Sequence, residues 1–157
     1  MGPLTDYSSY AEAQAHCSSE ALWALFDGDR ERLNIAHECL DRHRGRGVGI
    51  RVAHGDGRDE AYSLDEVADW SNRFAHFLKG RGIANGERVA LMLDPSLPFY
   101  FALFGTMKAG QVAVPLFTLF GPDGLALRID DCRPRLLLTT AALAERARGR
   151  ADLEVVI

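Results

Sequence analysis

The apolar residues of this chain fall into short continuous runs separated by longer stretches of helical period. Residues 89–93 and 136–138 are apolar without alternation, which is typical of strands covered on both faces of a sheet. Residues 112–114 form a similar run, and 153–157 begin another. Because helical patterns separate these runs, the sequence predicts parallel strands joined by right-handed crossovers. The predicted fold class is α/β, with an open, mostly parallel sheet and helices on both faces.

The clearest local signal is a helix start at Ser63. The Ser63 hydroxyl can accept a hydrogen bond from the backbone N–H of Glu66, while the Glu66 side chain reaches back to the backbone of Ser63. Apolar residues then follow at helical spacing: Leu64, Val67, Ala68, Phe74, Ala75 and Leu78. Gly82 is a natural left-handed stop. The pattern predicts an amphipathic helix from residue 64 to about 81.

Three more helices are expected along the sheet. Pro98 opens a helix that is apolar almost all round, so we expect it to be deeply buried, and Gly110 ends it. Another is predicted over about residues 123–131. Thr140 can cap the last one, over about residues 141–148.

The N-terminal part of the chain has a weaker pattern. Residues 1–33 mix small, polar and charged side chains around Trp23 and Phe26, which predicts a peripheral segment with one or two helices. Two short strand patterns and a glycine turn predict a small strand hairpin near residues 48–62. We therefore divide the chain into a peripheral segment, residues 1–33, and a partial α/β subdomain, residues 34–157.

The charge and cysteine content narrow the class of protein. With 18 basic and 22 acidic residues, the formal charge is -4 and neither sign forms a long run, so nucleic acid and anionic membranes are poor partners. Three cysteines, an odd number at no disulfide-framework spacing, favour a reducing cytoplasm. No targeting segment is visible, and the most apolar stretch, residues 97–107, is too short to span a membrane.

Common catalytic motifs are missing from the sequence. The glycines of residues 80–86 follow a predicted helix where a dinucleotide fingerprint needs a strand, so they predict a helix cap and a turn. His37, Cys39 and His43 fall in a short helix predicted from residue 35 to about 43, where neighbours two apart point away from each other. No second cysteine pair completes a zinc site. We therefore predict no catalytic, cofactor-binding or metal-binding residue in this chain.

Two loops are candidates for contact with a ligand. Open α/β sheets bind ligands beyond the carboxyl ends of their strands, which here means residues 94–96 and 116–122. The second loop, with two aromatic rings and a hydroxyl, could line an apolar substrate wall or pack against a neighbouring subdomain. Its candidate contact residues are Phe117, Thr118, Phe120 and Gly121.

Several segments in order resemble a known family. Residues 62–83 resemble the first core motif of the AMP-forming acyl- and aryl-CoA synthetases and adenylation domains, the adenylate-forming (ANL) superfamily. Residues 107–116 resemble its second core motif. Residues 34–36 and 41–43 resemble the opening segment of acetate- and medium-chain acyl-CoA ligases.

The resemblance implies an ATP-dependent acid–thiol ligase. Such an enzyme converts ATP and a carboxylic acid into an acyl-adenylate and pyrophosphate, then passes the acyl group to coenzyme A, as in fatty acid metabolism. The implied cofactors are ATP, Mg²⁺ and coenzyme A, and the implied acid is a short- or medium-chain aliphatic one. The family's phosphate loop, ribose aspartate and C-terminal lysine cannot be placed in residues 1–157. The chain by itself is therefore expected to be inactive and to bind none of these cofactors.

The end of the chain carries its own expectation. Val155, Val156 and Ile157 are apolar strand residues with no turn after them, which predicts a chain cut within a strand. The expected partners are the remainder of the ligase chain and, through the exposed sheet edge, a second copy of this chain. Two alternatives stay open: a freestanding non-catalytic binding or interaction module, and part of an adenylation domain that loads a carrier protein.

Overall fold

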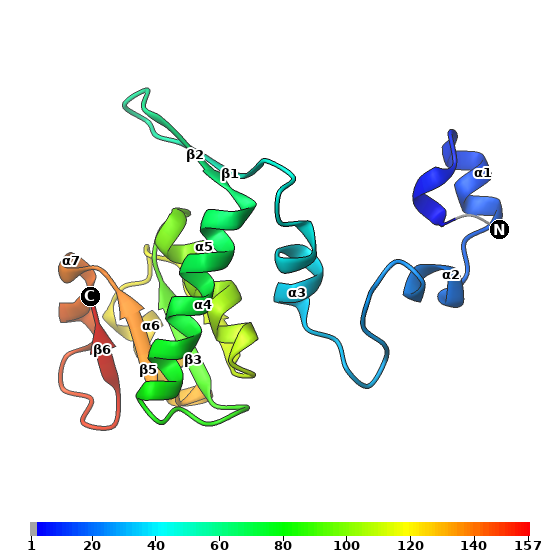
Figure 1. Cartoon of the computed structure of the whole chain (residues 1–157). Coiled ribbons are helices and arrows are strands. Elements are labelled where there is room, and N and C mark those ends of the chain that lie inside the picture. Colours follow the sequence, from blue (N-terminus) through cyan, green and yellow to red (C-terminus); the bar gives the residue numbers. More distant parts are fainter. Residues whose placement is uncertain (1–2) are drawn as a thin grey trace.

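A four-stranded parallel sheet forms the body of the protein in the computed structural model, which describes residues 3–157 (Figure 1). Its strands are β3 (Arg88–Met92), β4 (Val112–Pro115), β5 (Leu136–Thr139) and β6 (Glu154–Val156). They lie in the order β4-β3-β5-β6, and every neighbouring pair is parallel. The predicted open parallel sheet is confirmed.

Helices cover both faces of this sheet. Helices α4 (Leu64–Gly80) and α5 (Leu97–Lys108) pack on one face, and α6 (Pro122–Cys132) and α7 (Ala141–Ala144) pack on the other. Each helix links two parallel strands or leads into one, so the chain crosses the sheet as a series of β–α–β units. This arrangement places the loops after β3 and β4 at a common edge.

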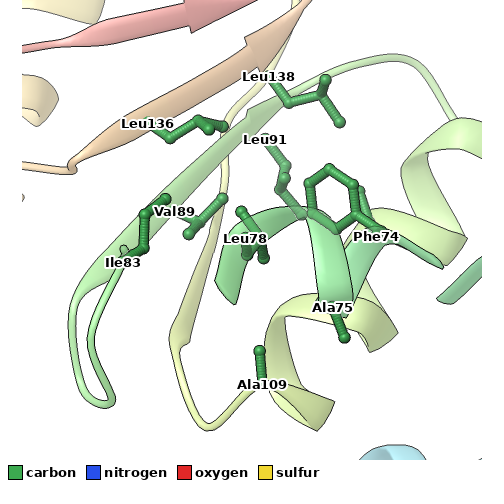
Figure 2. Close-up of a cluster of buried hydrophobic side chains, with 10 residues drawn as sticks. Phe74, Ala75, Leu78, Ile83, Val89, Leu91, Ala109, Leu136 and Leu138 are labelled. Carbon is green, nitrogen blue, oxygen red and sulfur yellow. The ribbon is translucent and has the colours of Figure 1, made fainter. Parts of the chain in front are cut away.

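The alternation of side chains along the strands explains their continuous apolar runs. Val89 and Leu91 of β3 face α4 and α5, whereas Ala90 and Met92 face α6. All four are fully buried. On the first face the core is built from residues of α4, β3 and β5, shown in Figure 2: Phe74, Ala75, Leu78, Val89, Leu91, Leu136 and Leu138.

Helix α4 begins as the capping box predicts. The Ser63 hydroxyl accepts from the backbone N–H of Glu66 at 3.2 Å, and the backbone N–H of Ser63 donates to the Glu66 carboxylate at 2.8 Å. Two orphan donors at the helix start are thereby satisfied. The helix runs 17 residues, to Gly80, close to its predicted end.

Helix α5 is less deeply buried than expected. Ala102, Gly105 and Thr106 are its buried residues, while its aromatic side chains are half-buried. A Cβ added at Gly105 would lie 2.7 Å from the backbone oxygen of Ser71, which shows how closely α4 approaches this side of α5. An apolar pattern all round a helix does not say which of its sides has a neighbour, and only one side is fully covered here.

A hairpin and a short helix precede α4. Strands β1 (Val48–Ala53) and β2 (Asp59–Ser63) pair antiparallel and project beyond α4 in Figure 1, as predicted for residues 48–62. Helix α3 (Ile35–Cys39) is followed by a 3₁₀ turn, Asp41–His43, and leads into β1. Leu40 packs against α4 beneath the hairpin.

The first part of the chain carries short helices with no buried residue. These are a 3₁₀ turn, Leu4–Asp6, and helices α1 (Tyr10–Ala15) and α2 (Ser19–Trp23). The segment joins the body near Glu38, whose carboxylate accepts from the backbone N–H groups of Asp27 and Gly28 at 3.2 and 2.8 Å.

The last predicted helix is shorter than expected. Helix α7 stops at Ala144 and continues as a 3₁₀ turn, Glu145–Ala147, and the Thr140 side chain makes no capping hydrogen bond. Without a cap, four residues do not hold a longer regular helix. Over residues 3–157, no helix combines the length and the apolar character needed to cross a membrane.

Candidate functional site

The two candidate loops meet at the carboxyl edge of the sheet. The Thr118 hydroxyl, after β4, donates to the Asp94 carboxylate, after β3, at 2.6 Å. The backbone oxygen of Asp94 also accepts from the Ser96 hydroxyl at 2.8 Å, at the start of α5. Since β3 and β4 are parallel neighbours, their following loops emerge side by side.

A small cavity lies between these loops. Its volume is about 220 Å³, and its walls are apolar apart from the Asp94 carboxylate and the Thr118 hydroxyl. The lining residues are Leu93, Asp94, Pro95, Phe99, Pro115, Leu116, Phe117 and Thr118. Because this volume is below that of an ordinary ligand pocket, the cavity can hold an apolar group but not a whole nucleotide.

Two arginines hold the second loop in place. Nη1 of Arg146 donates to the backbone oxygens of Thr118 and Phe120 at 2.7 and 2.8 Å. The Arg128 guanidinium lies over the Phe120 ring, 3.7 Å from its centroid. The loop is therefore fixed from the helix side, although it carries no regular structure of its own. Nothing in the local sequence indicates this role, because both arginines act across tertiary contacts.

The four candidate residues divide into two pairs. Phe117 and Thr118 line the cavity, and 73% of Phe117 is exposed. Phe120 and Gly121 lie outside the cavity. Phe120 packs edge-on against Phe117, with ring centroids 5.8 Å apart, and Gly121 precedes α6, where its carbonyl accepts from Leu125.

The histidines and cysteines of the N-terminal region do not converge. His37 pairs with Asp27, through Nε2 and the carboxylate at 2.9 Å, and not with Cys39 or His43. Among residues 3–157, no three histidine, cysteine or acidic side chains gather as metal ligands would. Burial raises the pKa of the Cys132 thiol, which makes it a poorer nucleophile at neutral pH.

The glycines of residues 80–86 form a turn. Gly82 and Gly86 have φ of 69° and 79°, the left-handed conformation that ends a helix or closes a turn. The backbone N–H of Gly86 donates to the carbonyl of Gly110 at 2.8 Å, so this turn is already occupied by a structural contact. The structure confirms the interpretation as a helix cap and turn.

Comparison with known proteins identifies the family. Residues 41–157 match the family described as AMP-binding enzyme, and the chain belongs to it. The predicted resemblance to the AMP-forming acyl-CoA synthetases is confirmed at the level of the family.

The relatives are much longer than this chain. Acetyl-coenzyme A synthetase of Bacillus subtilis (strain 168) is 32% identical over 143 residues, which are 88% of this chain and 25% of the relative. The chloroplastic/glyoxysomal acetyl-coenzyme A synthetase of Arabidopsis thaliana is 30% identical over 129 residues, 79% of this chain and 17% of the relative. The chain thus spans about a quarter or less of the length of these relatives.

Solved structures share the fold. The acyl-CoA synthetase of Brucella canis superposes with a TM-score of 0.84 over 96% of this chain and 29% of its own, at 24% identity. The anthranilate CoA ligase AuaEII, solved with anthranoyl-AMP, superposes with a TM-score of 0.64 over 77% of this chain and 24% of its own, at 29% identity.

Proposed function

We propose that this chain is the N-terminal part of an ATP-dependent acid–CoA ligase, which forms an acyl-adenylate and then an acyl-CoA thioester. Residues 34–157 would form a partial subdomain of the AMP-binding domain, and residues 1–33 a peripheral segment. The observation that carries the proposal is the family match over residues 41–157, together with 32% identity to an acetyl-coenzyme A synthetase over 143 residues. These comparisons do not favour a freestanding non-catalytic module.

In this proposal the chain is a structural scaffold, while the rest of the enzyme supplies the groups that bind and activate the phosphates of ATP. Negative charge accumulates on the phosphates during adenylation and requires cations or backbone donors. The charged side chain that lines the cavity between β3 and β4 is the carboxylate of Asp94, which repels a triphosphate. The residues that line this cavity therefore do not fit a triphosphate, and one carboxylate with one hydroxyl does not complete an octahedral Mg²⁺ site.

The cavity suits the acyl part of the substrate better. Phe99, Leu116 and Phe117 give it apolar walls, and its volume of about 220 Å³ matches a small apolar group. We propose that Phe117 and Thr118 border the site of a short- or medium-chain aliphatic acid. Phe120 and Gly121 would hold the loop or contact a neighbouring subdomain.

The proposed partners follow from the same assignment. The intact enzyme would take a carboxylic acid, ATP and coenzyme A in the cytoplasm, and the remainder of the ligase would pack on this chain. Val155 and Ile157, 37% and 74% exposed, lie at the β6 edge of the sheet, through which a second copy could also associate.

A chimera tests this function directly. Residues 34–157 replace the matching segment of the Bacillus subtilis acetyl-coenzyme A synthetase, and acid-dependent pyrophosphate release is measured with a series of straight-chain acids. We expect release with at least one acid, followed by thioester formation with coenzyme A. Arg46→Gln, at an exposed residue, serves as the matched control and should leave activity unchanged.

Two other outcomes are informative. The chimera could release pyrophosphate, form no thioester with coenzyme A and load a carrier protein instead. That result would show that the acyl acceptor is a carrier protein and not coenzyme A. A chimera with the size and melting temperature of its parent that releases no pyrophosphate with any acid would contradict the proposed function.

A further inference from the structure

A second cavity lies at the amino edge of the sheet, opposite the loops described above. Its volume is about 640 Å³, and it opens where β3, β5 and β6 begin. Four arginines line it: Arg88, Arg133, Arg135 and Arg150. Two aspartates, Asp130 and Asp152, also line it. We refer to this site as the arginine cavity.

Two of the four arginines have structural partners. Nε and Nη2 of Arg88 donate to the backbone oxygens of Cys132 and Arg133 at 2.7 and 3.1 Å, which braces the turn after α6. Arg150 forms a two-pronged ion pair with Asp130 across the cavity wall. These contacts fix the walls of the cavity and neutralise one of its aspartates.

The other two arginines keep most of their hydrogen-bonding capacity. The Arg133 side chain makes no ion pair or hydrogen bond with any residue of the described range 3–157. Arg135 reaches Glu87 at 3.5 Å, but its side chain is 60% exposed, so this pair is weak. Each guanidinium therefore has several N–H donors available to a ligand.

The backbone directs Arg133 into this position at some cost. Arg133 has φ 45° and ψ 63°, and it is the sole non-glycine residue with a positive φ among residues 3–157. A turn after a helix normally takes glycine or asparagine here, because other side chains are strained in this conformation. The turn alone gives no reason for an arginine, whereas a bound anion does.

Charge points to the sign of the ligand. Four arginines against two aspartates and Glu87, the partner of Arg135, leave a surplus of one positive charge, although the whole chain carries -4. Guanidinium groups bind tetrahedral oxyanions through paired, charge-assisted hydrogen bonds. We infer that the arginine cavity binds a phosphate group, held by Arg133 and Arg135 between walls fixed by Arg88 and Arg150.

This inference does not depend on the proposed ligase activity. The arginine cavity lies at the edge of the sheet where strands begin, whereas the cavity of Asp94 and Thr118 lies where strands end. Phosphate binding in the arginine cavity can therefore be absent while the ligase activity is present, and the reverse. A negative result for one proposal does not refute the other.

Titration calorimetry of the full 157-residue chain tests the inference, with inorganic phosphate and glycerol 3-phosphate as probes. We expect saturable binding that weakens as salt is added. The double variant Arg133→Asn, Arg135→Gln should bind at least about tenfold more weakly, since it loses two charge-assisted contacts. Asparagine tolerates the left-handed backbone, so the turn is retained. Tighter binding of glycerol 3-phosphate would identify a phosphate ester, and equal binding the phosphate group alone.

Arg46→Gln is the matched control, because it removes one exposed arginine far along the chain from this cavity and should bind like the parent chain. Far-UV circular dichroism and a melting curve establish that the double variant is folded. The inference is overturned if neither probe produces saturable heat, or if the folded double variant binds both probes as tightly as the parent chain.

Discussion

The ammonium group of Lys108 lies 2.6 Å from the carboxylate of Asp41, across 67 residues of sequence. The Lys108 side chain is 9% exposed and also donates to the side-chain oxygen of Asn72 at 2.9 Å and to the backbone oxygen of Ala68 at 3.3 Å. One cation thereby joins the end of α5, helix α4 and the 3₁₀ turn that precedes the hairpin.

We predict that Lys108→Met destabilises the chain by about 2 kcal/mol, because it leaves a half-buried carboxylate without its cation. The exposed residue Lys79 gives the control variant Lys79→Met, which should change stability by less than about 0.5 kcal/mol. Urea unfolding measures both. The double variant Asp41→Asn, Lys108→Met should recover part of the loss, and strictly additive effects of the two changes would argue against a direct interaction.

The capping box at the start of α4 gives a second prediction. Ser63→Ala should lower the free energy of unfolding by about 1 kcal/mol, because the N–H of Glu66 loses its acceptor. Thr140→Ala is the matched control, since the Thr140 side chain makes no capping bond at α7 and its removal should have little effect. Equal urea midpoints for Ser63→Ala and the parent chain would contradict the assigned helix start.

The same contact predicts a pH dependence. The backbone N–H and the hydroxyl of Ser63 hold the pKa of the Glu66 carboxyl below its ordinary value of 4.5. Because the folded pKa is the lower one, this stabilisation is complete above pH 4.5 and is lost as the pH falls through the folded pKa. The stability difference between Ser63→Ala and the parent chain should therefore shrink in acid. Urea midpoints at neutral pH and near pH 3 measure it.

The junction between α5 and β4 depends on Gly110. Its φ is 76°, and an added Cβ would lie 3.1 Å from the Asn85 side chain. We predict that Gly110→Val destabilises the chain by about 2 kcal/mol or more, because a β-branched residue is strained in the left-handed region. Gly121→Ala is a control at a glycine with negative φ and open space around its Cβ position. Similar melting temperatures for the two variants would refute the proposed strain.

The role of Phe117 can be separated from folding. In the chimera, Phe117→Ala should raise KM for the acid several-fold and leave the melting temperature nearly unchanged, because 73% of this residue is exposed. Leu119→Ala, at a neighbour that is 89% exposed and outside the cavity, is the matched control. Equal KM values for both variants would remove Phe117 from the acid site and leave it as a subdomain contact.

The sequence predicts those features of the fold that depend on neighbouring residues. The start of α4 follows from Ser63 and Glu66, and β3 follows from an apolar run that both faces of the sheet bury. The burial of α5 was predicted wrongly, because an apolar helix does not reveal how many neighbours it has. For the Thr118–Asp94 contact, the sequence predicts that the loops after two parallel strands lie at the same edge of the sheet. It does not predict which side chains of these loops form a hydrogen bond. The support that Arg146 gives to this loop could not be anticipated, since it depends on tertiary geometry.

Acid-dependent pyrophosphate release by the purified 157-residue chain, measured beside the chimera in one assay, decides whether this chain is scaffold or a complete catalyst. We expect release by the chimera and none above background by the chain alone, because the cavity at the β3 and β4 edge presents a carboxylate and no cation to a triphosphate. Robust release by the purified chain itself would contradict the scaffold role, since it would require a complete adenylation site within residues 1–157.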